Sequence, residues 1–204
     1  MKLLIATPYY SGFNIDSEKE MPKTYRLSVA RTIKALGADF KIENTLALSC
    51  RVDSARNYLI NLDWDKLLFV DHDMEWNGTD IKKLLKADKP FIGALYRMKR
   101  DEILYAISPQ LNNLRGIKEV GRIGFGLVLL DRSVFISMSH AYQNLYAFDS
   151  GLQQSVYCLF APMLKDGLYF GEDYSFCERW RKIGGKIFVH TGVRPTHWGK
   201  VAYR

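Results

Sequence analysis

Hydrophobic and polar positions along the chain follow two alternating periods, which predict strands and helices in turn. Short apolar runs, typical of strands buried on both faces, occupy residues 3–6, 67–70, 91–96 and 125–130. From Thr24 to Leu36, apolar residues recur every three or four positions, as on one face of a helix, and Gly37 follows as a stop signal. This alternation predicts an α/β fold with a mostly parallel central sheet flanked by helices.

Weaker patterns predict the remaining elements. Further helices are expected at 54–62, with Ser54 as the N-cap, and at 81–85 and 176–183; further strands are expected at 40–42, 104–107 and 186–190. Residues 142–165 have the least regular pattern, so we expect a mobile or substrate-covering segment there. No repeat or linker interrupts the chain, which indicates one domain.

Composition narrows the choice of partner and compartment. With 204 residues, 48% of them hydrophobic, the chain can bury a substantial core. Its 29 Lys and Arg residues against 22 Asp and Glu favour an anionic partner, but do not choose among a nucleotide, a nucleic acid and a lipid headgroup. Three scattered cysteines, Cys50, Cys158 and Cys177, indicate neither a disulfide framework nor a zinc site and fit a reducing compartment.

The N-terminal apolar run is too short for a signal peptide, and no other segment approaches the length of a membrane span. We therefore expect a cytoplasmic protein without a transmembrane segment, whose contact with a membrane would be peripheral.

The strongest chemical signal follows the apolar run Leu67–Val70, which stops at Asp71, His72 and Asp73. Continued strand alternation would point both carboxylates to one side and His72 to the other. Ligands of open α/β sheets bind outside the carboxyl ends of strands, and two carboxylates there suit Mg²⁺ or Mn²⁺. Alternatively, the carboxylates cap the turn at residues 77–80, where a helix begins. Both interpretations remain open at this stage.

A second signal is the glycine-rich run Gly121–Gly126. It precedes a strand, whereas a dinucleotide-binding loop follows a strand and opens a helix, so a Rossmann fingerprint is excluded. Its glycines serve either a turn with positive φ or the close approach of backbone to a ligand.

Two further signals lie near the C-terminus. Glu172 and Asp173 begin the last long helix, where carboxylates either stabilise the helix N-terminus or remain ionised as a general base requires. His197 and Lys200 lie in a basic, aromatic tail, and His197 is either a metal ligand, a diphosphate contact or an ordinary polar residue.

In their order and spacing, these segments resemble the metal-dependent glycosyltransferases of the GT-A fold. The resemblance spans nearly the whole chain and rests on residues 6–9, 54–57, 70–73, 124–126, 171–173 and 197–199. The chain is also similar to glycosyltransferase domains encoded by chlorella viruses. The resemblance implies a single GT-A-like (Rossmann-like) domain over residues 1–204, with a nucleotide-binding half at about 1–100 and an acceptor-binding, catalytic half at about 101–204. If the protein is virus-encoded, the resemblance implies that it is located in the cytoplasm of the host cell.

The resemblance also implies roles for individual residues. Asp71 and Asp73, with His197, would hold Mn²⁺ or Mg²⁺ against the diphosphate of a sugar nucleotide. Asp173, with Glu172 beside it, would activate the acceptor hydroxyl. The remaining residues implied to bind the donor nucleotide are Thr7, Pro8, Tyr9, Arg56, His72, Gly124, Gly126 and Lys200. His72 departs from the pattern, because related enzymes often have a smaller or less basic residue there.

The implied reaction transfers a sugar from a nucleoside-diphosphate sugar, most commonly a UDP-sugar in this family, to a glycan or glycoprotein acceptor; no nucleic acid is expected. Three alternatives remain. A haloacid-dehalogenase-type phosphohydrolase also uses Asp-x-Asp, but normally on its first strand. A sugar nucleotidylyltransferase needs a glycine-rich basic loop, of which residues 7–12 are a poor version. A nucleic-acid-binding module would use the basic residues Arg97, Lys99, Arg100, Arg179, Arg181 and Lys182.

Overall fold

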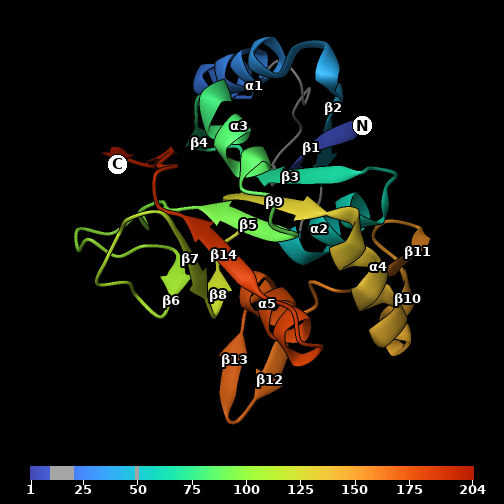
Figure 1. Ribbon diagram of the computed structural model, residues 1–204. Coiled ribbons are helices and arrows are strands. Elements are labelled where there is room, and N and C mark those ends of the chain that lie inside the picture. Colours follow the sequence, from blue (N-terminus) through green and yellow to red (C-terminus); the bar gives the residue numbers. More distant parts are fainter. Residues whose placement is uncertain (10–20, 49–50) are drawn as a thin grey trace.

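A seven-stranded sheet forms the centre of the molecule in the computed structural model, which describes residues 1–9, 21–48 and 51–204 (Figure 1). In spatial order its strands are β2 (Lys41–Leu48), β1 (Lys2–Tyr9), β3 (Lys66–Val70), β9 (Leu127–Asp131), β5 (Phe91–Ala94), β14 (Ile187–His190) and β7 (Ile117–Val120). Strands β2, β1, β3, β5 and β14 share one direction, whereas β9 and β7 run antiparallel to their neighbours. The predicted α/β fold with a mostly parallel sheet is therefore confirmed.

Helices cover both faces of this sheet (Figure 1). Helices α1 (Lys23–Leu36) and α3 (Gly78–Lys86) pack on one face, and α2 (Val52–Asn61), α4 (Arg132–Ala141) and α5 (Glu172–Lys182) pack on the other. Strand β3 supplies both cores, because Leu67 and Phe69 face the α2 side while Leu68 and Val70 face the α1 side. This two-sided burial explains why the strand is continuously apolar.

Local signals account for most helix ends. The side chains of Asn77 and Asp80 form a capping box at the start of α3. Gly37, with φ of 60°, ends α1 and begins a short 3₁₀ turn (Gly37–Asp39). The expectation that Ser54 caps α2 is wrong: the helix starts at Val52, and the Ser54 hydroxyl donates to Asp149 Oδ2 at 2.8 Å. The Ser54 side chain therefore bonds to a residue far along the chain and not to the backbone of its own helix.

Smaller sheets surround the main one. In one of them, β15 (Thr196–Trp198) lies between β16 (Ala202–Tyr203) and β4 (Met74–Glu75). In another, β6 (Ile107–Ser108) pairs with β8 (Arg122–Ile123). Only the end of the expected strand at 104–107 is thus a strand.

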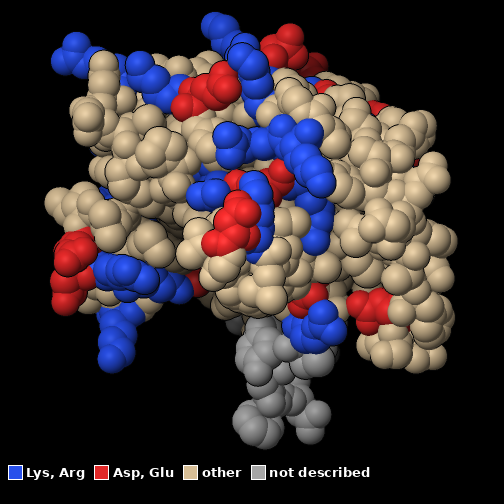
Figure 2. Space-filling model, turned by 90° about the horizontal axis from the view of Figure 1, so that it is seen from below, with Lys and Arg blue, Asp and Glu red and all other residues tan. Residues whose placement is uncertain are grey.

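Two antiparallel hairpins, β10 (Tyr146–Asp149) with β11 (Gln154–Tyr157) and β12 (Met163–Lys165) with β13 (Leu168–Phe170), follow α4 and a 3₁₀ turn (Gln143–Leu145). Residues 142–165 are therefore more regular than their sequence pattern indicates. Seen from the end where β12 and β13 lie, Lys and Arg side chains gather near the middle of the face (Figure 2).

None of the helices in the described ranges combines the length and hydropathy needed to cross a membrane. Cys158 and Cys177 are free thiols, and Cys50 lies outside the described residues, as do residues 10–12 of the loop considered for a nucleotidylyltransferase.

Candidate functional site

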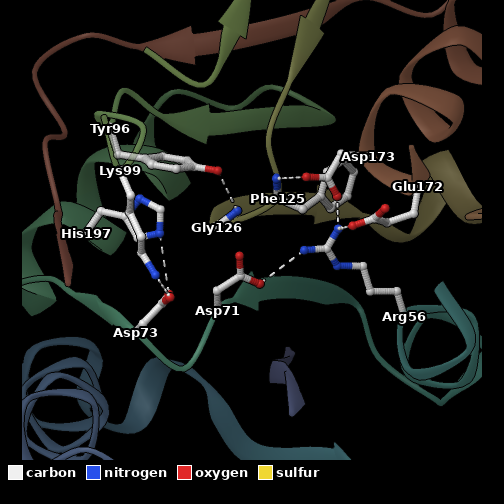
Figure 3. A network of polar contacts seen from close by, with 10 residues as sticks. All are labelled: Arg56, Asp71, Asp73, Tyr96, Lys99, Phe125, Gly126, Glu172, Asp173 and His197. Atoms are coloured by element: carbon white, nitrogen blue, oxygen red, sulfur yellow. Dashed lines mark hydrogen bonds and ion pairs between the residues drawn. The ribbon is translucent and has the colours of Figure 1, made fainter. Parts of the chain in front are cut away.

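The two aspartates of the Asp-x-Asp motif pair with different partners (Figure 3). Strand β3 ends at Val70, and the chain turns at once, with the Met74 N–H donating to the Asp71 carbonyl at 3.1 Å. Asp71 therefore contacts Arg56, at 3.1 Å, whereas Asp73 contacts Lys99 and lies 3.6 Å from His197 Nε2. Strand alternation stops before the motif begins, so it does not set the directions of the two carboxylates; both nevertheless line one small hollow while pairing with different cations.

Neither aspartate acts as a cap in the hydrogen bonds of the described residues. The start of α3 is capped by Asn77 and Asp80 instead, so the capping interpretation of Asp71 and Asp73 is wrong. His72 packs edge-on against Tyr9, with ring centroids 5.2 Å apart.

Arg56 connects the motif to the start of α5. Its side chain on α2 is only 2% exposed and lies over the rings of Phe125 and Phe160 at 5.4 and 5.9 Å. The guanidinium pairs with Asp71 at 3.1 Å, with Glu172 at 3.6 Å and with Asp173. One buried cation thus balances three carboxylates from two distant segments.

Asp173 also holds the glycine-rich segment in place. It lies in the first turn of α5, as expected, and its Oδ2 accepts a hydrogen bond from the Phe125 backbone N–H at 3.0 Å. The N-cap of α5 is Gly171, which has no side chain. Helix capping alone therefore does not account for Asp173, whose contacts cross to Phe125 and Arg56.

Asp73 lies in a separate, basic environment. Burial by itself would raise the pKa of Asp73, but His197 and Lys99 beside it outweigh burial and lower that pKa to about 2. The carboxylate is therefore ionised at neutral pH.

The C-terminal tail reaches Asp73 because β15 pairs with β4, directly after the motif. The Trp198 N–H donates to the Asp73 carbonyl at 2.8 Å, and His197 Nδ1 lies 2.9 Å from the Arg97 carbonyl. Lys200, by contrast, is exposed in the turn between β15 and β16.

Asp73 and His197 are the residues best placed to hold a divalent cation. Asp73 Oδ1 is buried and has no hydrogen-bond partner, and a carboxylate with an imidazole suits Mn²⁺ or Mg²⁺ when water and phosphate complete the shell. Among the described residues, however, no three His, Cys, Asp or Glu side chains converge on one point. The residues fit a metal bound by two side chains, and Asp71 would have to leave Arg56 to join them.

The glycines of the segment 124–126 make room for Tyr96. Neither Gly124 nor Gly126 has a positive φ, so the turn interpretation is wrong for them. A Cβ on Gly124 would lie 2.4 Å from the Tyr96 hydroxyl, which accepts a hydrogen bond from the Gly126 N–H at 3.1 Å. Burial raises the pKa of this phenol, so it stays protonated.

Two adjoining hollows meet at Glu172 and Asp173. The smaller, about 220 Å³, is lined by Pro8, Val52, Arg56, Asp71, His72, Asp73, Glu172 and Asp173. The larger, about 530 Å³, is lined by Tyr96, Met98, Lys99, Arg100, Ala106, Gly124, Gly171, Glu172, Asp173, Tyr174 and His197. All but four of the predicted site residues line one or both.

The four predicted site residues that line neither hollow are Gly126, Lys200 and two residues of β1, Thr7 and Tyr9. Thr7 is fully buried and its hydroxyl lies 2.6 Å from that of Tyr25, while Tyr9 is buried against His72. Of the three β1 residues expected to border the nucleotide base, only Pro8 therefore faces a hollow. Tyr96 was not predicted as a site residue, and Lys99 was expected only on the nucleic-acid surface of the alternative function. The basic run after the strand at 91–96 was the available signal.

Comparisons with known proteins show likeness in fold alone. No family model matches the chain, and no curated protein matches its sequence. A solved structure described as A197 from STIV aligns with 98% of this chain and 86% of its own, with 14% identity and a TM-score of 0.56. A second, 4-diphosphocytidyl-2C-methyl-D-erythritol synthase from Anaerococcus prevotii DSM 20548, aligns with 70% of this chain and 76% of its own, with 12% identity and a TM-score of 0.41. The chain therefore shares an α/β fold with the first of these structures.

Proposed function

We propose that the site binds a nucleoside-diphosphate sugar together with Mn²⁺ or Mg²⁺ and transfers the sugar to an acceptor hydroxyl. The observation that carries this proposal is the meeting of two carboxylate groups, Asp71 with Asp73 and Glu172 with Asp173, beside two adjoining hollows. A sugar donor and an acceptor need adjacent cavities, and Glu172 and Asp173 line both hollows, where the two substrates would meet.

The diphosphate of the donor would lie near Asp73, His197 and Lys99. When bound there, the cation would neutralise the negative charge that develops on the departing diphosphate. Lys99 pairs with Asp73 in this structure and would turn to a phosphate oxygen once the cation replaces it. Arg56 and Pro8 line the smaller hollow, which would hold another part of the donor.

The acceptor would occupy the larger hollow, beside Asp173 and Glu172. In the proposed step the acceptor oxygen bonds to the anomeric carbon, the bond from that carbon to the diphosphate breaks, and the nucleoside diphosphate leaves with the electron pair. Asp173 takes the proton of the acceptor hydroxyl. Arg56 pairs with this carboxylate and holds it at the edge of the hollow.

A thermal-shift panel of UDP, GDP, CDP and dTDP, each with and without Mn²⁺, tests the donor half of the proposal. A ligand that binds the folded state alone raises its melting temperature, and we expect UDP with Mn²⁺ to give the largest rise. Stabilisation by a nucleoside triphosphate with release of pyrophosphate on adding a sugar phosphate would instead indicate a nucleotidylyltransferase. Absence of any Mn²⁺-dependent shift would contradict both.

The variant Asp173→Asn tests the catalytic half. An amide keeps the shape of the side chain but cannot accept the proton, so we expect transfer to slow by about a hundredfold to ten-thousandfold while nucleotide affinity is retained. Glu172→Gln is the matched control and should retain more activity. If Glu172→Gln loses the activity and Asp173→Asn keeps it, Glu172 is the base.

A further inference from the structure

The hairpin of β12 and β13 carries apolar side chains that the fold does not use. Its tight turn places Asp166 and Gly167 at positive φ, 52° and 75°, as in the two-residue turns typical of hairpins. Cross-strand pairing puts Met163 beside Phe170 on one face and Leu164 beside Tyr169 on the other. Phe170 is buried beneath Arg122, so the first face attaches the hairpin to the molecule.

The opposite face and the tip are open to solvent. Leu164 is 80% exposed, Tyr169 is 69% exposed and Leu168, next to the turn, is 59% exposed. Isolated apolar residues on a surface need no explanation, but here Leu164 and Tyr169 form a cross-strand pair on the open face and Leu168 lies beside the turn on the other face, so the tip presents three large exposed apolar side chains, which favours a partner. In Figure 1 this hairpin extends away from the sheet beyond α5, so its tip can reach a flat surface.

The surroundings of the hairpin are basic. Glu178 on α5 pairs with Arg122 at 2.8 Å, Lys165 at 2.7 Å and Arg181 at 3.4 Å, so three cations share one carboxylate. Lys182 lines the same hollow as Leu164, Lys165 and Glu178. The exposed Asp166 at the turn offsets only part of this charge, and Figure 2 shows Lys and Arg gathered on this face.

We propose that this hairpin attaches the protein to the surface of an anionic membrane. Leu164, Leu168 and Tyr169 would enter the boundary between headgroups and acyl chains, and the surrounding Lys and Arg side chains would contact acidic headgroups. An apolar tip combined with several cations is the combination that gives stable but reversible attachment, since neither contribution is sufficient alone. The chain's formal charge of +7 adds a general attraction to such a surface.

The position of the hairpin gives this attachment a consequence for the site. Strand β13 ends at Phe170 and leads directly into Gly171, the N-cap of α5, which lines the larger hollow with Glu172 and Asp173. A membrane-bound hairpin would hold that hollow near the surface. The attachment itself does not depend on which reaction the site performs.

Co-sedimentation with lipid vesicles tests the proposal. The full chain should bind vesicles of equimolar phosphatidylcholine and phosphatidylglycerol, bind pure phosphatidylcholine much less, and be released by salt. The double variant Leu164→Ser, Tyr169→Ser, whose side chains are largely exposed, should keep its circular dichroism spectrum and lose at least about tenfold in vesicle affinity. Ile33→Ser, an exposed apolar residue on α1 at the far side of the molecule, is the control and should bind as the parent does.

Three results would overturn the proposal. The first is failure of the parent protein to bind the mixed vesicles, and the second is equal binding by the double variant. The third is a dimer in sedimentation velocity that the double variant converts to a monomer, which would show that the hairpin binds a second copy of the chain instead.

Discussion

At the scale of single residues, Arg56 determines how the candidate site is held together. It is buried between aromatic rings and pairs with Asp71, Glu172 and Asp173, which come from the end of β3 and the start of α5. Since the three carboxylates lie close to one cation, removing that cation leaves like charges facing one another in a partly buried place.

Replacing Arg56 by Met should therefore lower the free energy of unfolding by about 3 kcal/mol, because the apolar side chain fills the space but leaves the carboxylates unpaired. Urea unfolding at neutral pH measures this loss. Arg56→Lys retains the charge and should recover part of the stability. Equal stability of the Met variant and the parent would mean that the three ion pairs contribute nothing to the fold.

The pair of Gly124 and Tyr96 gives a second residue-scale prediction. Gly124→Ala should destabilise the protein by about 1–3 kcal/mol, because the new methyl group would overlap the Tyr96 hydroxyl. Tyr96→Phe removes that oxygen but also the acceptor of the Gly126 N–H, so the comparison is made within a cycle of variants: Gly124→Ala should cost less when added to Tyr96→Phe than when made in the parent. An equal cost of Gly124→Ala in both backgrounds, measured by urea unfolding, would show that the glycine serves some purpose other than room for the Tyr96 hydroxyl.

At the scale of elements, the sequence predicted those whose signals are local. The run Leu67–Val70 gives β3 with nearly correct ends, because burial on both faces leaves a continuous apolar run. The ends of α1 are also nearly correct, but most of its apolar stripe is exposed, as at Leu27 and Ile33, and the buried face instead includes the polar residues Ser28 and Thr32. The direction of β9 had no such signal, since a buried antiparallel strand reads the same as a parallel one. The different partners of Asp71 and Asp73 were not predicted, because β3 ends at Val70, directly before the motif.

Asp131 supports the junction of β9 and α4 in a pH-dependent way. Burial would raise its pKa, but Lys66, at 2.6 Å, and the N–H of Ser133 lower that pKa below the usual 3.8. A carboxyl whose pKa falls on folding stabilises the folded state above its unfolded pKa, and this stability is lost as pH falls through the folded pKa.

Asp131→Asn keeps a capping side chain without the charge. It should cost no more than about 1 kcal/mol at pH 7, because the pair is partly exposed, and the difference from the parent should shrink once the pH drops below the usual pKa. Thermal unfolding of both proteins across acidic pH measures it. A difference that stays constant with pH would assign the effect to shape rather than charge.

At the scale of the whole molecule, the candidate site depends on contacts between distant parts of the chain. Pairing of β15 with β4 brings His197 to Asp73, and α2 brings Arg56 to the start of α5. Periodicity along a sequence carries no information about such pairings; only the order of motifs, compared with a known family, placed Asp71, Asp73 and His197 in one site. Lys99 could not be assigned in this way, because a basic residue in a loop fits many functions.

A calorimetric titration of UDP into the protein, with and without Mn²⁺, tests the proposed donor site most directly. Binding should require Mn²⁺, and Asp73→Asn should weaken it by at least about tenfold, or 1.4 kcal/mol, while the fold is retained. Asp101→Asn, an exposed carboxylate replaced in the same way, is the control and should bind as the parent does. Binding of UDP that is equally tight without Mn²⁺, or unchanged in folded Asp73→Asn, would contradict a metal-dependent nucleotide site at Asp73.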